Sequence, residues 1–225
     1  MKFYAVIVAG GSGIRMNTGI PKQFLLLNGK PVMMHTIAAF VSSPQQPEIV
    51  LVLNEKHFEI WEQLCKEYHF DTPHQLVAGG NTRFASVKNA LNIITETAVI
   101  AVHDAVRPLI TTEIIAKSYQ QALENGNAIV AVPSKDSVRW QNAQGISQNL
   151  NRSEIFLVQT PQTFQSDILK KAYEQLYLEE FTDDASVVER SGIKINLLPG
   201  DQENFKITFP ADLKIAAMIL NEKSR

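Results

Sequence analysis

Glycines and two basic residues lie together near the start of the chain, directly after an apolar run. This segment reads Ala9-Gly10-Gly11-Ser12-Gly13-Ile14-Arg15-Met16, and Pro21-Lys22-Gln23 follows it. Glycines after a strand let backbone amides approach phosphate oxygens that a Cβ would block. Arg15 and Lys22 would bring two cations to one anion, which suits a triphosphate because charge develops on its oxygens during displacement. The alternative is a glycine-rich turn with two solvated surface cations.

Two common nucleotide-binding motifs do not fit this loop. A P-loop ends in Gly-Lys-Ser/Thr, whereas Gly13 is followed by Ile14 and Arg15. The dinucleotide fingerprint needs a third glycine where Met16 stands, and a helix that opens at once where Pro21 intervenes. The sequence therefore excludes a P-loop and disfavours a nicotinamide or flavin site.

Asp104 follows a predicted strand, 98–103, and so lies where open α/β sheets place their ligands. Its carboxylate is a natural oxygen ligand for magnesium on a triphosphate. The alternative role is to cap the turn before Arg107. We interpret the neighbouring His103 as a neutral core residue. The five histidines lack metal-ligand spacing, so no zinc site is expected.

Short apolar runs that alternate with helical periods must position these residues. The clearest predicted strands are 3–9, 48–53, 98–103 and 128–133, and the clearest helices are 56–69, 81–96, 112–125 and a last one that starts at Pro210. This alternation predicts an α/β fold with a mostly parallel sheet covered by helices on both faces. At 225 residues the chain suits one domain spanning 1–225.

Residues 134–152 break the rhythm, because they are rich in Ser, Asn, Gln and Lys and have weak apolar periodicity. We interpret them as an excursion from the core. Such a segment is either a mobile loop or a β-arm that pairs with a second subunit, and composition does not choose between them.

Composition narrows the classes of protein. Hydrophobic residues make up 45% of the chain and charged residues 20%, with a formal net charge of -2, as in soluble globular proteins. We expect no nucleic-acid partner, because there is no basic excess. No apolar run approaches the roughly 18 residues of a membrane span. The single cysteine, Cys65, is compatible with a reducing compartment, so a cytoplasmic location is expected.

Six motifs in order resemble the 2-C-methyl-D-erythritol 4-phosphate cytidylyltransferases of the non-mevalonate isoprenoid route, a family of the nucleotidyltransferase superfamily. Besides the glycine loop they are Gly79-Gly80-Asn81-Thr82-Arg83 with Ser86, Val102-His103-Asp104-Ala105-Val106-Arg107-Pro108, Gln159-Thr160-Pro161-Gln162, Thr182-Asp183-Asp184-Ala185-Ser186 and Asn204-Phe205-Lys206-Ile207-Thr208. The resemblance spans nearly the whole chain. It implies a three-layer, Rossmann-like nucleotidyltransferase fold with a protruding β-arm.

The resemblance also implies an activity: transfer of CMP from CTP to 2-C-methyl-D-erythritol 4-phosphate, giving 4-diphosphocytidyl-2-C-methyl-D-erythritol and pyrophosphate. Magnesium, or another divalent cation, would be held by Asp104. The arm at 134–152 would be exchanged in a homodimer, so that Arg107 or Ser137 can serve the partner's site. An acceptor phosphate oxygen would attack the α-phosphorus in line, with no covalent enzyme intermediate.

Site residues follow from the matched positions. The resemblance assigns nucleotide binding to Ala9, Gly10, Gly11, Ser12, Gly13, Gly80, Asn81, Arg83, Ser86 and Asp104. It assigns acceptor binding to Arg107, Ser137, Arg152, Thr160 and Thr182, and catalysis to Arg15, Lys22, Arg152 and Lys206. Structural alternatives stay open: Asn81 and Thr82 could cap a helix while Arg83 is solvated, Thr182 could be an N-cap, and Lys206 could be solvated in an edge strand.

Two rival functions are compatible with parts of the sequence. A ribitol-5-phosphate cytidylyltransferase that makes CDP-ribitol differs only in the acceptor, and Val106 favours it, since the isoprenoid enzymes usually carry alanine there. The longer match from Thr182 to Glu189 favours the isoprenoid enzymes. A non-catalytic CTP-binding protein should have lost one of the cations Arg15, Lys22 and Lys206, and all three are present.

Overall fold

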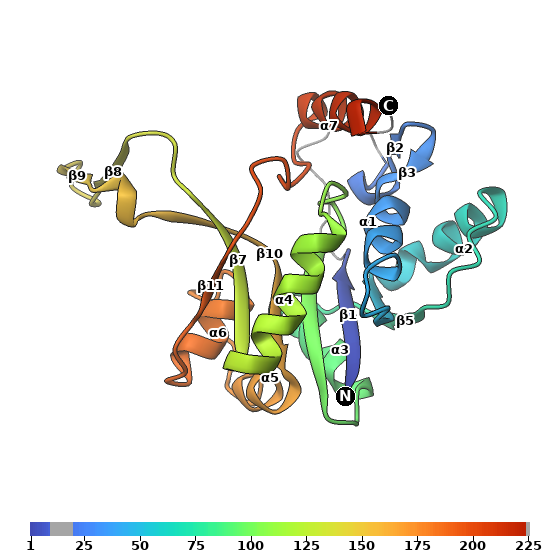
Figure 1. Cartoon of the computed structure of the whole chain (residues 1–225), viewed down its shortest axis with the longest axis horizontal. Coiled ribbons are helices and arrows are strands. Elements are labelled where there is room, and N and C mark those ends of the chain that lie inside the picture. Colours follow the sequence, from blue (N-terminus) through green and yellow to red (C-terminus); the bar gives the residue numbers. More distant parts are fainter. Residues whose placement is uncertain (10–19, 224–225) are drawn as a thin grey trace.

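A seven-stranded sheet forms the centre of the protein (Figure 1), for which a computed structural model describes residues 1–9 and 20–223. Its strands stand in the order β11-β7-β10-β6-β1-β4-β5. Their bounds are β1 (Lys2–Val8), β4 (Glu48–Leu53), β5 (Gln75–Ala78), β6 (Ala98–Asp104), β7 (Asn127–Pro133), β10 (Phe156–Gln165) and β11 (Leu197–Pro199). β10 runs antiparallel to β6 and β7, whereas the other neighbouring strands pair in parallel. The predicted mostly parallel sheet is confirmed.

Helices cover both faces of this sheet, because successive strand side chains point to opposite sides. Ala5 and Ile7 of β1 belong to the cluster covered by α1 (Val32–Val41), α2 (Phe58–Glu67) and α4 (Thr112–Asn125). Tyr4 and Val6 belong to the cluster covered by α3 (Arg83–Ile93), α5 (Ser166–Ala172) and α6 (Asp184–Arg190). The result is the three-layer α/β fold that the sequence predicts.

Local capping sets where the helices begin. The Thr82 hydroxyl accepts a hydrogen bond from the Ala85 amide at 3.0 Å, so α3 starts at Arg83 and is shorter than the predicted 81–96. The predicted helix 56–69 starts instead as a 3₁₀ turn, η3 (Glu55–His57), which is capped by the Asn54 side chain. Both corrections come from side chains that satisfy the first backbone amides of a helix.

A third cluster closes the carboxyl end of the sheet beneath α7 (Pro210–Lys223). Ala216 of this helix is buried, and Leu213, Ala217 and Leu220 pack with it against Leu27 of β2 (Leu26–Leu27). Strand β2 pairs with β3 (Lys30–Pro31). Residues 200–209, the crossing segment, connect β11 to α7 without regular structure. Lys206 lies in this segment, so the alternative that placed it in an edge strand is wrong.

Residues 134–152, the arm, contain a hairpin of β8 (Val138–Gln141) and β9 (Ser147–Leu150). Figure 1 shows the hairpin projecting well away from the sheet. The segment therefore forms a β-hairpin, and its pairing with a second subunit stays a prediction. Two large apolar side chains on it, Trp140 and Ile146, are exposed.

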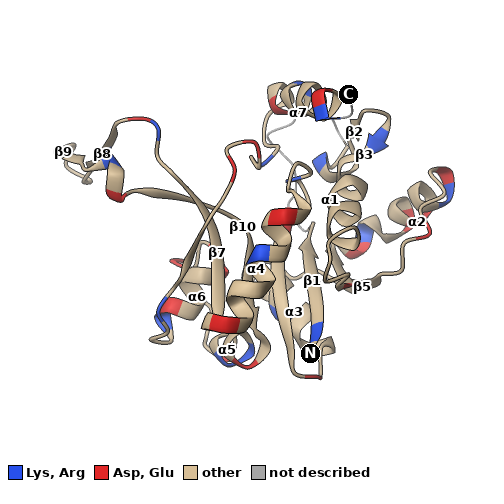
Figure 2. Cartoon of the chain, viewed as in Figure 1, with Lys and Arg blue, Asp and Glu red and all other residues tan. Residues whose placement is uncertain are grey.

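Charged residues are spread over the outer elements, with Lys and Arg mixed among Asp and Glu, while the central strands are largely uncharged (Figure 2). This distribution matches the near-neutral composition. Within residues 1–9 and 20–223, no helix is long and apolar enough to cross a membrane.

Candidate active site

A cleft of ≈ 270 Å³ lies at the carboxyl end of β6. Side chains from α3, β6 and the turn after it, β10, the residues just before α6 and the crossing segment line it: Arg83, Asp104, Arg107, Val158, Gln159, Thr160, Gln162, Thr182, Asp183 and Lys206. Open α/β sheets bind their ligands outside the carboxyl ends of the strands, so the cleft has the expected place. Six of the predicted site residues line it.

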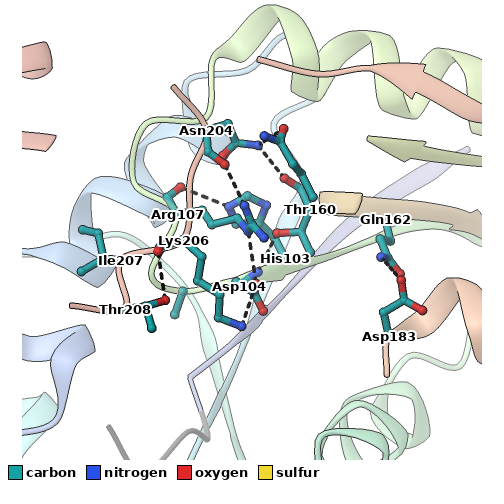
Figure 3. A network of polar contacts seen from close by, with 12 residues as sticks. His103, Asp104, Arg107, Thr160, Gln162, Asp183, Asn204, Lys206, Ile207 and Thr208 are labelled. Atoms are coloured by element: carbon teal, nitrogen blue, oxygen red, sulfur yellow. Dashed lines mark hydrogen bonds and ion pairs between the residues drawn. The ribbon is translucent and has the colours of Figure 1, made fainter. Parts of the chain in front are cut away.

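Asp104 is the buried carboxylate of the cleft, and two cations contact it (Figure 3). Lys206 Nζ lies 3.1 Å and Arg107 Nε 3.2 Å from the same oxygen, Oδ2. Burial works to raise the pKa of Asp104, but Lys206, Arg83 and Arg107 together hold it well below its usual range. The carboxylate is therefore ionised at neutral pH and available as an oxygen ligand.

His103 is the core residue that the sequence indicated. Its side chain is fully buried beside Phe40, and its Nε2 donates to the Arg107 carbonyl at 3.2 Å. Burial lowers the pKa of His103 to about 3 although Asp104 opposes this. The imidazole is neutral at physiological pH, and its hydrogen bond stabilises the turn that carries Arg107.

A buried amide, Asn204, holds the crossing segment over the cleft. Its Nδ2 donates to the Thr160 backbone carbonyl at 2.8 Å and to Gln159 Oε1 at 3.2 Å, while the backbone carbonyl of Asn204 accepts from Arg107 Nη1 at 2.7 Å. The Gln159 amide donates in turn to the Asp201 carbonyl. These bonds fix the backbone two residues before Lys206, so they determine where its ammonium group can reach.

Lys22 approaches the same segment from the other side. It begins the 3₁₀ turn η2 (Lys22–Phe24), is buried, and donates from Nζ to the Ile207 carbonyl at 3.0 Å. The next residue, Gln23, donates to the Ala9 carbonyl at 2.8 Å, which ties this turn to the end of β1. Two predicted catalytic lysines thus meet at residues 206–207. Gly10, Gly11, Ser12, Gly13 and Arg15 lie outside the described residues.

The start of α3 carries the residues predicted for the nucleotide. The Gly80 amide donates to Ser86 Oγ at 3.1 Å, and a Cβ at Gly80 would lie 2.4 Å from Ala85 Cβ, so only glycine fits. Asn81 is exposed beside it. Arg83 is not solvated: its guanidinium forms a bidentate pair with Asp184 at 2.8 and 2.6 Å.

The residues predicted for the acceptor divide into two groups. Arg107, Thr160 and Thr182 line the cleft, and the Thr160 hydroxyl accepts from the Asp104 amide at 3.1 Å. Thr182 is not an N-cap, because Asp183 fills that position of α6. Ser137 and Arg152 lie on the arm, exposed and outside the cleft lining, and Arg152 Nη1 donates to the Lys135 carbonyl.

Asp104 also decides how a divalent cation could bind. Among the described residues there is no group of three or more His, Cys, Asp or Glu side chains that could hold a metal ion. Magnesium commonly takes one or two carboxylates and completes its shell with substrate phosphates and water. One ionised carboxylate in a cationic cleft fits that arrangement and does not fit a metal cage built from protein alone.

The sheet topology and this cationic cleft at the strand ends define an α/β enzyme that handles phosphorylated substrates. A model of the family described as IspD: 2-C-methyl-D-erythritol 4-phosphate cytidylyltransferase matches residues 3–222. The chain belongs to this family, and it is a cytidylyltransferase. The family and the enzyme class predicted from the sequence are confirmed.

Individual relatives agree along their whole length. The proteins named 2-C-methyl-D-erythritol 4-phosphate cytidylyltransferase from Bacteroides thetaiotaomicron and Porphyromonas gingivalis are 45% and 46% identical to this chain over 220 residues. These alignments cover 98% and 97% of this chain, and 100% and 98% of those proteins. A crystal structure of 4-diphosphocytidyl-2C-methyl-D-erythritol synthase from Anaerococcus prevotii is similar at a TM-score of 0.83 and 26% identity, covering 98% of this chain and 96% of that one.

The sequence alone gave no role to several polar residues that line the cleft or hold its lining residues in place. These are Gln162, Tyr173, Asp184 and Asn204. Gln162, Asp184 and Asn204 lie within matched motifs, so the motifs themselves were the signal. Tyr173 lies outside the matched motifs, and an aromatic residue at the end of a helix is usually a core residue without a functional role.

Proposed function

We propose that this protein transfers the cytidylyl group of CTP to 2-C-methyl-D-erythritol 4-phosphate, giving 4-diphosphocytidyl-2-C-methyl-D-erythritol and pyrophosphate in isoprenoid biosynthesis. The observation that carries the proposal is the set of cations around Asp104, in a chain that matches this family from end to end. Both substrates are phosphate anions, and a cationic cleft reduces the repulsion between them.

The reaction is a single in-line displacement. An oxygen of the acceptor phosphate attacks the α-phosphorus and forms a new P–O bond, while the bond from the α-phosphorus to the bridging oxygen breaks. Pyrophosphate leaves with that electron pair. Lys22 and Lys206, with Arg15, neutralise the charge that develops, and positioning accounts for most of the remaining rate. Arg107, Thr160 and Thr182 hold the acceptor phosphate and its hydroxyls.

Magnesium, or another divalent cation, would supply positive charge to the triphosphate when it is bound. Asp104 would hold it, because this carboxylate is ionised within the cleft. Lys206 and Arg107 keep the carboxylate in one orientation by sharing Oδ2. The cytoplasmic location stays a prediction from the sequence.

We also propose a homodimer in which the two copies exchange arms. Exposed apolar side chains on and beside the arm support this. Trp140 and Ile146 lie at the hairpin, and Phe156 and Leu157 lie just after the arm, at the start of β10. The arm also carries Ser137 and Arg152, which lie outside the cleft of their own chain. In the dimer they would complete the partner's cleft.

Co-expression of two inactive variants tests the exchange. Lys206→Met disables its own cleft but keeps a good arm, and Arg152→Ala keeps a good cleft but disables its arm. If arms act in the partner, random dimers regain about a quarter of wild-type activity, because half of the dimers contain one intact site. If Arg152 acts in its own chain, the mixture stays as inactive as its parents.

The acceptor is tested by pyrophosphate release from CTP with 2-C-methyl-D-erythritol 4-phosphate and ribitol 5-phosphate in parallel. Turnover with the first alone is expected. The observation that favoured ribitol was Val106, and this side chain is buried in the third cluster and is not among the residues lining the cleft. Turnover with ribitol 5-phosphate alone would show that the acceptor assignment is wrong.

A further inference from the structure

The pair formed by Arg83 and Asp184 joins elements that are 101 residues apart in the chain. Arg83 is the first residue of α3 and Asp184 the first residue of α6. Arg83 Nη1 donates to Asp184 Oδ1 at 2.8 Å, and Nη2 donates to Oδ2 at 2.6 Å. The Asp184 side chain is 0% exposed and that of Arg83 27%, so the pair lies at the inner wall of the cleft.

A third donor reaches the same carboxylate. The hydroxyl of Tyr173, which follows α5, lies 2.6 Å from Asp184 Oδ1. Its buried ring stacks on Phe84 at 4.6 Å between centroids, and this packing holds the ring in place. Burial first, and then Asp184, raise the pKa of Tyr173, so the phenol stays protonated and acts as the donor.

A buried ion pair of this kind is weak support for a purely stabilising role. Desolvation offsets much of its attraction, and apolar replacements of such pairs are often as stable. Asp184 does not touch the cleft itself, since Arg83 stands between them. The bidentate geometry fixes the orientation of Arg83, whereas one hydrogen bond to a flexible cation would not.

The same end of α6 is also tied to the sheet. Gln162 of β10 donates from Nε2 to Asp183 Oδ2 at 2.8 Å (Figure 3) and accepts from the Ala185 amide at 2.8 Å. Asp183 is the N-cap of α6 and forms a capping box with Ser186. Residues 183–186 are thus held from α3 and from β10, and Thr182 precedes them directly in the cleft wall.

We propose that Asp184, oriented by Tyr173, is a positioning residue that couples the two halves of the cleft. Its carboxylate holds Arg83 on the nucleotide side, and its place at the start of α6 holds Thr182 on the acceptor side. A displacement of Asp184 therefore affects both substrates at once. This inference rests on the proposed function, because it takes the two sides from the roles given to Arg83 and Thr182.

Two variants test the coupling, and a third is a matched control. Asp184→Asn keeps the shape of the side chain and removes its charge, and Tyr173→Phe removes one donor while Asp184 stays. Val188→Ala, at a fully buried position of α6, weakens the packing of the same helix and leaves the ion pair intact. Thermal unfolding, the affinity for CTP by calorimetry, and KM and kcat for both substrates are measured for each.

Asp184→Asn is expected to weaken CTP affinity and to raise the KM of the acceptor, with a total loss of about 10- to 100-fold in kcat/KM, as for other groups that orient binding residues. Tyr173→Phe should lose about 2- to 10-fold, the worth of one hydrogen bond. Val188→Ala should lower the Tm and leave both KM values unchanged.

If all three variants fold and their KM values equal those of the wild-type protein, the coupling is refuted. The pair of Arg83 and Asp184 then has only a structural role. An Asp184→Asn effect on only one substrate would overturn it too. If Asp184→Asn does not fold, Tyr173→Phe decides by the same two readouts. If the wild-type protein turns over neither acceptor, the proposed function is refuted instead. The CTP affinity of the variants then still tests whether Asp184 orients Arg83.

Discussion

Replacing Lys206 with methionine separates catalysis from stability. Methionine keeps the length and apolar stem of lysine and removes the ammonium group that lies 3.1 Å from Asp104. The Lys206 side chain is 41% exposed, and Asp104 keeps its second cation, Arg107, at 3.2 Å. The variant therefore removes one positive charge from the cleft without leaving the buried carboxylate unpaired.

The two expected magnitudes differ widely. Loss of one group that stabilises transition-state charge lowers turnover about 10²- to 10³-fold, or roughly 3–4 kcal/mol of activation free energy. A partly exposed ion pair contributes about 0–1 kcal/mol to folding. For a chain of this size that is a Tm shift of at most about 4 °C. An activity loss far larger than the stability loss is the expected signature.

Initial rates of pyrophosphate release and thermal unfolding measure both quantities on one preparation. Lys117→Met is the matched control, because Lys117 also pairs with a carboxylate, Glu113 at 2.6 Å, but on the exposed surface of α4. This control should show no measurable change in turnover. Near-normal turnover of Lys206→Met would refute the catalytic role. A loss of stability above about 3 kcal/mol, as for a broken buried pair, would show that Lys206 is mainly structural.

Three further predictions follow from the same contacts. Lys22→Ala should lower turnover at least about 100-fold, because the cation beside Ile207 is lost, and initial rates that stay near normal would sink the role. Asn204→Ala should cost about 1–3 kcal/mol in urea unfolding and lower kcat, since the crossing segment loses its buried anchor; unchanged values would show that other contacts hold it. His103 should make folding pH-dependent: its folded pKa of about 3 lies below the unfolded value of 6.5, so stability present above 6.5 is lost as the pH falls. The loss from pH 7 to pH 5 is about 2 kcal/mol, and His103→Asn should remove it from urea titrations at the two pH values.

Much of the fold was readable because its signals are local. Strand β4 and helix α4 have the bounds that their apolar runs predict, and Pro210 marks the start of α7. Strand β10 was missed because its middle reads Gln159-Thr160-Pro161-Gln162, which lacks the apolar character of a central strand. Those polar side chains are tolerated there because distant groups satisfy them, as Gln162 is satisfied by α6.

The site was predictable in its residue types and not in its pairings. Motifs identified Arg83, Asp104 and Lys206. No local pattern predicts that Arg83 pairs with Asp184, or that Lys206 contacts Asp104, because both pairs join distant parts of the chain. Such contacts depend on the order of strands in the sheet, which periodicity does not encode. The alternative of a solvated Arg83 failed for that reason.

The arm leaves the sheet from β7 and returns through β10, and these two strands are neighbours that pair at Pro133 and Phe156. Its two ends are therefore held side by side by the sheet itself, whatever lies between them. A segment whose ends are fixed in this way can be lengthened, shortened or replaced without altering the strand order. The arm is therefore a suitable site for inserting foreign sequence. Chimeras that exchange the arm between family members would show how much of the substrate preference is transferred with it.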